Sequence, residues 1–182
     1  MAGRVYLPDD RAMFALIDGF PQRRQVAFCK AMTQLVRAKE FRFPPEVAVD
    51  VERRADPETD TQLLIWLEAV QGSMSCSVAY GYKRKAQGWA QANGYADGLD
   101  FVVEGRDGTC IVAVVGYVLE LQDAGVECSV ITNDHRPRPG RAPLGEVCKK
   151  LTIPTISPAD FISNVLRPMT MPPPIPPTTR VR

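Results

Sequence analysis

Apolar residues recur along this chain with two spacings, one typical of strands and one typical of helices. Short apolar runs that end at turn residues predict strands at residues 5–7, 41–43, 99–103, 126–131 and 151–156. Apolar residues three and four positions apart predict helices at residues 11–20, 22–39, 46–54, 61–71, 82–92, 110–122, 144–150 and 158–166. Because strands alternate with helices, we expect an α/β fold, a three-layer sandwich with a mainly parallel central sheet flanked by helices.

Two neighbouring segments give the clearest signal in this pattern. Residues 110–122 are almost continuously apolar, and a helix with so little polar surface must be buried on most sides. Residues 126–131 follow after a short turn and are apolar on both faces, as a central parallel strand is. The sequence therefore predicts a buried helix followed by a central strand.

The chain has 182 residues, a length typical of one domain, but its last part differs in composition from the rest. Residues 1–166 contain the whole alternating pattern, and we expect them to form the domain. Residues 167–182 hold three Arg, no acidic residue and six of the sixteen Pro, which predicts an extended, disordered tail. Residues 172–177 of this tail are also typical of a polyproline ligand that binds a partner protein.

The charge balance excludes one class of nucleic-acid-binding protein. The formal net charge is +1, and without the three Arg of the tail the remaining residues carry 19 basic against 21 acidic side chains. A faintly acidic domain does not bind nucleic acid by bulk positive charge, as histones do. An enzyme that acts on nucleic acid through a local basic rim remains compatible with this balance.

The cysteines and the lone histidine exclude a zinc site of the usual kind. The five Cys include no CxxC pair, and a single His cannot complete a Cys/His site. Cys110, Cys128 and Cys148 lie in apolar runs, so we expect buried free thiols in a reducing compartment. The first residues do not resemble a signal peptide, and no apolar stretch approaches the length of a membrane span. These observations predict a soluble cytoplasmic protein with no membrane partner.

Acidic residues follow several of the predicted strands or open the adjacent helices; they are Asp9, Asp10, Asp50, Asp107 and Asp134. Each alone is as easily explained as a turn residue or a helix cap. Ligands of α/β folds bind at the carboxyl edge of the sheet, where these side chains are expected to meet. Clustered carboxylates repel one another, and Mg²⁺ or Mn²⁺ relieves that repulsion through oxygen ligands. The pattern therefore predicts metal-assisted hydrolysis of a phosphodiester.

Several short motifs in the same chain resemble the PIN-domain family. The C-terminal ones are Thr132-Asn133-Asp134 at the end of a strand, a helix at residues 144–148, and a strand and helix at residues 153–161. Residues 5–17 are similar to the opening strand, Asp and apolar helix of that family, and residues 47–51 to its second acidic motif. Trp66 lies where one PIN-like subgroup of unknown function has Trp-Leu. The resemblance covers about residues 4–166, and its motifs are short.

The resemblance implies a Mg²⁺- or Mn²⁺-dependent ribonuclease, often the toxin of a toxin–antitoxin pair, with an antitoxin protein and a homodimer as further expected partners. By position the catalytic and metal-binding acids are Asp9 or Asp10, then Asp50, Asp107 and Asp134. Thr132 and Asn133 are expected to contact the metal, its water or the substrate, and Arg136, Arg138 and Arg141 the RNA backbone. A metal-bound water would attack in line and leave a 5′-phosphate and a 3′-hydroxyl.

The chain also departs from the family pattern. The second acid is Asp50 where Glu is usual, so Glu46 and Glu52 are alternatives, and the polar residue expected after the first acid is replaced by Arg11 or Ala12. A degenerate, non-catalytic PIN-like binding module is therefore the competing hypothesis. A third hypothesis, a receiver-like domain phosphorylated on Asp9 or Asp10, lacks the Lys expected after a late strand.

Overall fold

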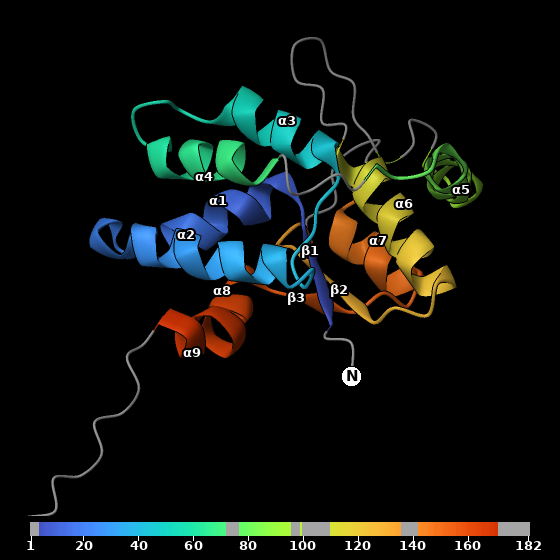
Figure 1. Ribbon diagram of the computed structural model, residues 1–182. Coiled ribbons are helices and arrows are strands. Elements are labelled where there is room, and N and C mark those ends of the chain that lie inside the picture. The colour runs from blue at the N-terminus through green and yellow to red at the C-terminus, as the bar shows by residue number, and fades with distance from the viewer. Residues whose placement is uncertain (1–3, 72–76, 96–98, 100–109, 136–141, 171–182) are drawn as a thin grey trace, which may run out of the picture.

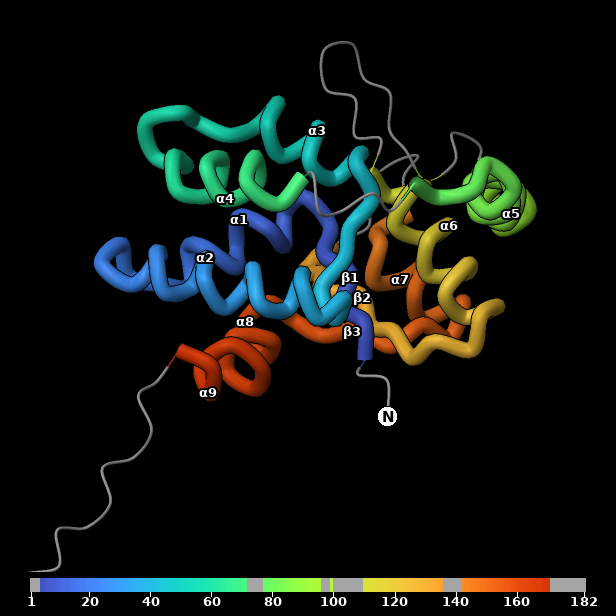
Figure 2. The backbone as a smooth tube through the Cα atoms, in the orientation of Figure 1, coloured from blue at the N-terminus to red at the C-terminus, as the bar shows by residue number. Residues whose placement is uncertain are grey.

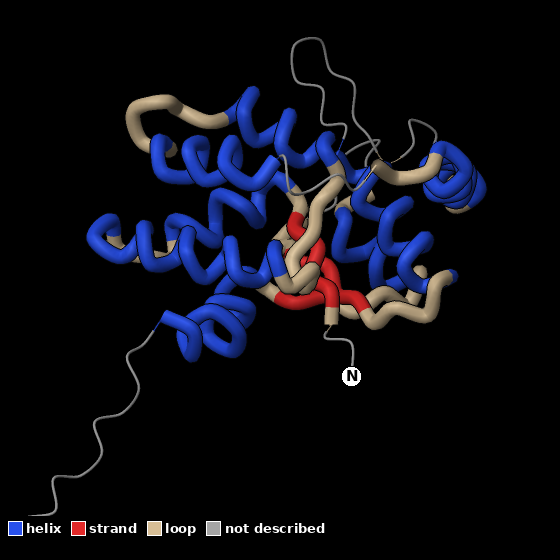
Figure 3. Tube along the Cα trace, in the orientation of Figure 1, coloured by secondary structure: helices blue, strands red, loops and turns tan. Residues whose placement is uncertain are grey.

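Three parallel strands form the centre of the computed structural model, which describes residues 4–71, 77–95, 99, 110–135 and 142–170. The strands are β1 (Val5–Pro8), β2 (Cys128–Ile131) and β3 (Thr155–Ile156), in the spatial order β1-β2-β3. Leu7 is in register with Val130, and Val130 in turn is in register with Thr155. Figure 3 shows this small sheet enclosed by helices. The expected α/β class and parallel sheet are confirmed.

Helices cover both faces of the sheet. They are α1 (Asp10–Asp18), α2 (Gln22–Arg37), α3 (Pro45–Arg54), α4 (Thr61–Gln71), α5 (Tyr80–Ala92), α6 (Cys110–Asp123), α7 (Leu144–Lys150) and α8 (Pro158–Phe161). In Figure 1, α1, α2 and α8 lie on one side of the strands, and α6 and α7 on the other, with α5 packed outside α6. Helices α3 and α4 lie beyond the carboxyl end of β1. This arrangement is compatible with the three-layer sandwich expected from the sequence.

Helix α6 and strand β2 form as their apolar pattern predicts. All four residues of β2 are buried, because β2 is paired on both edges and covered by α6. Helix α6 exposes only its last two residues, Gln122 and Asp123, to a large extent. Gly116 of α6 lets α5 approach closely, since a Cβ atom there would lie 3.2 Å from the backbone of Tyr82 and Lys83. The buried helix and central strand are confirmed.

Three predicted strands are shorter than their apolar runs. One is β2, which begins at Cys128, two residues after its predicted start. Residues 41–43 contribute only one bridge, between Phe41 and Tyr6, because the prolines that follow cannot donate to a ladder and Pro45 already begins α3. Residues 151–153 turn instead of pairing: Thr152 has φ of 57° and the N–H of Ile153 donates to the last turn of α7. Pairing begins at Pro154, whose carbonyl accepts a hydrogen bond from the N–H of Val130. Residues 100–103 of another predicted strand lie outside the described residues.

The C-terminal helix extends beyond the predicted end of the domain. After α8 the chain continues as a π-helical segment, η1 (Ile162–Leu166), and then as α9 (Arg167–Thr170), which contacts α2. A tail beginning at residue 167 is therefore wrong by four residues. Pro168 comes just after the π-helical turn, and because it lacks an N–H, this continuous helical segment loses one hydrogen bond. Residues 171–182, the rest of the predicted tail, lie outside the described residues.

The core beneath the sheet edge is rich in aromatic side chains. Phe41 packs against Phe43, Trp66 and Phe161, with ring centroids 5.9 to 6.4 Å apart.

Cys110, Cys128 and Cys148 are buried free thiols, as expected. Among the helices of the described residues, none has the length and apolar character needed to cross a membrane. Figure 2 traces how the chain brings β2 and β3, which come late in the sequence, into one sheet with β1.

Candidate functional site

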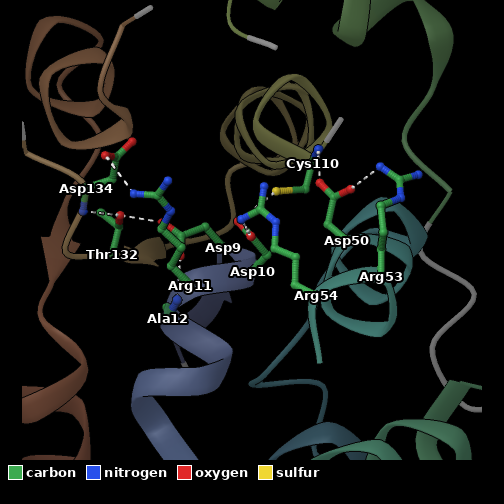
Figure 4. A network of polar contacts seen from close by, with 10 residues as sticks. All are labelled: Asp9, Asp10, Arg11, Ala12, Asp50, Arg53, Arg54, Cys110, Thr132 and Asp134. Atoms are coloured by element: carbon green, nitrogen blue, oxygen red, sulfur yellow. Dashed lines mark hydrogen bonds and ion pairs between the residues drawn. The ribbon is translucent and has the colours of Figure 1, made fainter. Parts of the chain in front are cut away.

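Four buried carboxylates lie together at the carboxyl edge of the sheet. Asp9 and Asp10 directly follow β1, Asp134 follows β2, and Asp50 reaches the same region from α3 (Figure 4). None of the four is more than 6% exposed. Acidic side chains buried to this degree are rare without specific partners. The structure therefore brings together every acid predicted for the site that lies within the described residues.

Asp9 is held by the fold through both carboxylate oxygens. It is the N-cap of α1, where Oδ1 accepts a hydrogen bond of 2.6 Å from the N–H of Ala12. Its Oδ2 accepts one of 2.5 Å from the hydroxyl of Thr132. Burial raises the pKa of Asp9 to about 6 despite these two bonds, with Asp10 and Asp134 adding repulsion. Asp9 thus anchors the start of α1 to the end of β2.

Asp10 instead faces an arginine. Its Oδ2 forms an ion pair with Arg54, the last residue of α3, and its Oδ1 accepts a hydrogen bond from the thiol of Cys110 at 3.3 Å. Burial raises the pKa of Cys110, so the thiol keeps its proton and acts as the donor. The sequence left Asp9 and Asp10 equivalent, whereas their contacts assign them different surroundings.

Asp50 connects α3 to the start of α6. Its Oδ2 accepts a hydrogen bond of 3.0 Å from the N–H of Cys110, one of the helix-end donors that have no partner inside α6. Its Oδ1 lies 3.5 Å from Arg53. The two alternatives point elsewhere, since Glu46 pairs with Lys83 and Glu52 bonds to Gln71. Asp50 is the acid of this segment that lies in the cluster.

Asp134 lies at the end of the cluster opposite Asp50 (Figure 4). Its Oδ2 accepts a hydrogen bond of 3.1 Å from the N–H of Leu144, the first residue of α7, and its Oδ1 lies 3.8 Å from Arg11. Its own N–H donates to Thr132. Thr132 is 1% exposed and therefore links Asp9 to Asp134, while Asn133 is exposed beside them.

Three arginines each pair with one of these acids, and the sequence did not predict that they belong to the site. Arg11, Arg53 and Arg54 have side chains 37% to 44% exposed, so each spans the boundary between the buried carboxylates and solvent. The sequence indicated Arg11 only as a departure from the family pattern, and it gave no site role to Arg53 or Arg54. The spacing of Asp50 and Arg53 by three positions in a helix is the signal that could have found one of these pairs.

The remaining predicted site residues lie outside the described part of the chain. These are Asp107, Arg136, Arg138 and Arg141. Their expected roles as third acid and RNA contacts stay predictions.

The chemistry of the donor set fits a hard divalent cation, because carboxylate oxygens are what Mg²⁺ and Mn²⁺ prefer. All eight carboxylate oxygens nevertheless contact protein donors. Among the described residues, no three or more His, Cys, Asp or Glu are arranged to hold a metal ion. The donors are thus suitable in kind, and their present arrangement is one in which arginines balance the acids.

Comparison of the chain with protein-family models, with curated proteins and with solved structures finds no significant match.

Proposed function

We propose that this protein is a metal-dependent ribonuclease of the PIN-like class. The observation that supports this proposal best is the meeting of Asp9, Asp10, Asp50 and Asp134 at one edge of a parallel sheet. These residues come from three separate segments of the chain, and burying four carboxylates together is costly. A fold that needed only helix caps would not require them to share one site.

The contacts suggest different roles for these acids. Asp10, Asp50 and Asp134 each have one oxygen on a half-exposed arginine, so they would hold Mg²⁺ or Mn²⁺, with Asp107 as a further predicted ligand. Asp9, with both oxygens on buried donors, would position α1 and Thr132. A bound cation supplies a water of lowered pKa and a charge that binds the scissile phosphate. RNA is the proposed substrate, and a toxin role with an antitoxin and a homodimer is part of the proposal.

The test is cleavage of a labelled single-stranded RNA by the purified full chain in Mg²⁺, in Mn²⁺ and in EDTA. We expect metal-dependent products with 5′-phosphate ends, lost in EDTA and reduced at least about 100-fold in Asp10→Asn and Asp134→Asn. Asp123→Asn is the matched control, because Asp123 lies at the exposed end of α6 and pairs with Lys85. Cleavage that survives EDTA, or that survives both site substitutions, contradicts the proposal.

A second candidate function, a protein-binding module, is supported by a groove between α2 and α4. Its volume is about 440 Å³, and Val26 and Ile65 on its rim are 53% and 56% exposed. Lys30 and Arg37 also line it, and among the described residues neither forms an ion pair with an acid. Exposed apolar groups beside unpaired cations suit an acidic amphipathic helix of a partner protein.

Binding of a synthetic helical peptide with Leu on one face and Glu on the other tests this second function. We expect affinity that falls at least about fivefold in the double variant Lys30→Glu and Arg37→Glu, because two attractive charges become repulsive. Lys149→Glu on the distant α7 is the control. Equal affinity in all three proteins contradicts a docking role for this groove. An absence of stabilisation by millimolar Mg²⁺, combined with peptide binding, would favour the module over the nuclease.

A further inference from the structure

The arginines at the acid cluster contact its carboxylates in a repeated way. In Asp10, Asp50 and Asp134, one oxygen bonds to a donor that the fold fixes, namely the thiol of Cys110, the N–H of Cys110 and the N–H of Leu144. The other oxygen faces an arginine. The fixed donors hold each carboxylate in place, whereas a long, partly solvated arginine can leave without disturbing the backbone.

Arg54 is the arginine whose position is most informative. It spans from the end of α3 to the start of α1, and its guanidinium lies between Asp10 and Asp50 in Figure 4. Arg53 contacts Asp50 within α3 at 3.5 Å, and Arg11 lies 3.8 Å from Asp134. Arg54 therefore supplies positive charge at the middle of the cluster, beside the Asp10 carboxylate, which is 6% exposed.

The Arg54 guanidinium and a divalent cation would compete for the Asp10 carboxylate. A buried anion needs one cation beside it, and two cations at the same oxygen repel each other. Once displaced, the Arg54 guanidinium would lie at the carboxyl edge of the sheet, where the substrate is proposed to bind. The planar guanidinium can donate two parallel hydrogen bonds to one phosphate group.

We infer that Arg54 exchanges partners during function. It neutralises Asp10 in the metal-free protein, and it binds a phosphate of the RNA once the carboxylates hold a divalent cation. This inference rests on the proposed nuclease function, and it adds a substrate-binding residue that the sequence motifs did not indicate. It also explains why an arginine, and not an uncharged donor, lies over Asp10.

Metal titration followed by thermal unfolding tests the first half of the exchange without any cleavage assay. For the wild type, Arg54→Gln, Arg54→Lys and the control Arg23→Gln, at an exposed position of α2, the melting temperature is measured against Mn²⁺ concentration. We expect Arg54→Gln to melt lower without metal and to reach half-maximal stabilisation at a Mn²⁺ concentration roughly fivefold lower. Arg54→Lys keeps the charge and should remain close to the wild type, as should Arg23→Gln.

Binding of adenosine 5′-monophosphate to the metal-loaded proteins tests the second half. The nucleotide carries the 5′-phosphate of the proposed product, so we expect it to stabilise the wild type and Arg23→Gln. The stabilisation should be weaker in Arg54→Lys, which loses the fork, and absent in Arg54→Gln. If Arg54→Gln does not fold, unchanged nucleotide binding by Arg54→Lys overturns the inference on its own.

The outcomes separate the two proposals. A wild type that responds to Mn²⁺ with the same midpoint as Arg54→Gln overturns the exchange and leaves the nuclease proposal standing. A response by Arg54→Gln alone also overturns the exchange, because Arg54 then excludes the metal from the wild type and is not displaced by it. No response to Mn²⁺ in either protein overturns both.

Discussion

The acid cluster and the groove between α2 and α4 differ in whether their charged side chains face a partner of opposite charge. At the acid cluster, Arg11, Arg53 and Arg54 each face a buried carboxylate. In the groove, Lys30 and Arg37 are exposed, and among the described residues they face no acid. A solvated cation is stable without a partner, whereas a buried carboxylate needs a hydrogen bond or a countercharge. The carboxylates of the cluster are therefore part of the folded structure, whereas the cations of the groove remain solvated.

Removing an acid from the cluster should give the largest loss of stability. Asp50→Ala deletes the acceptor for the buried N–H of Cys110 at the start of α6. An unsatisfied buried donor and a lost helix cap together cost about 3 kcal/mol. Urea unfolding at neutral pH in EDTA measures this free energy. Asp50→Asn retains an acceptor and serves as the control, so equal stability of the Ala variant and the wild type would show that Asp50 does not stabilise α6.

The pH dependence of stability should change when Asp9 is replaced. Burial raises its folded-state pKa from the ordinary value of 3.8 to about 6, so the native state binds the extra proton and the wild type loses stability as pH rises from 4 to 6. Asp9→Asn keeps the N-cap acceptor but has no titration. We expect its stability relative to the wild type to rise by about 1 kcal/mol per pH unit in this window and to level off above it. Urea unfolding in EDTA at several pH values measures the difference, and a flat difference would contradict it.

The floor of the groove should show a smaller effect. Trp66 is 5% exposed, and its indole N–H donates to the hydroxyl of Thr33 at 3.1 Å. Trp66→Phe keeps most of the apolar contact and loses this hydrogen bond, which we expect to cost about 1 kcal/mol. Thermal and urea unfolding measure it. A cost as large as that of Asp50→Ala would mean that the groove floor matters to stability as much as the acid cluster.

The rim of the groove should show almost no effect. Ile65→Ala removes a side chain that is 56% exposed, so we expect a change in the free energy of unfolding below about 0.5 kcal/mol. Peptide binding should fall in the same variant if the groove is a docking surface. A large loss of stability would show that Ile65 belongs to the core, and the contrast between the two regions would fail.

Much of the fold could be predicted because hydrophobic periodicity reports local structure directly. The buried helix α6 and the central strand β2 were both expected, since each is apolar on nearly all sides. The short pairing at Phe41 and at Thr155–Ile156 was not, because an apolar run does not show where a ladder ends. That depends on where the neighbouring backbone turns, as it does at Thr152.

The candidate site divides in a similar way. Acids that follow strands are recognisable in a sequence, and those within the described residues do meet. The partners of those acids were not predictable, because Arg54 and Asp10 are 44 positions apart and Cys110 and Asp10 are 100 apart. Contacts at such separations depend on how α1, α3 and α6 pack, which no local pattern specifies.

The amino-acid sequence by itself determined the class of fold, the central helix and strand, and the set of acids at the sheet edge, because burial and strand ends leave local patterns. Only the tertiary structure decided that Asp9 caps α1, that Asp10 faces Arg54, and that Asp50 rather than its neighbouring glutamates lies in the cluster. The physical reason is that a carboxylate's environment is set by the distant side chains around it, and these come into reach only when the helices pack.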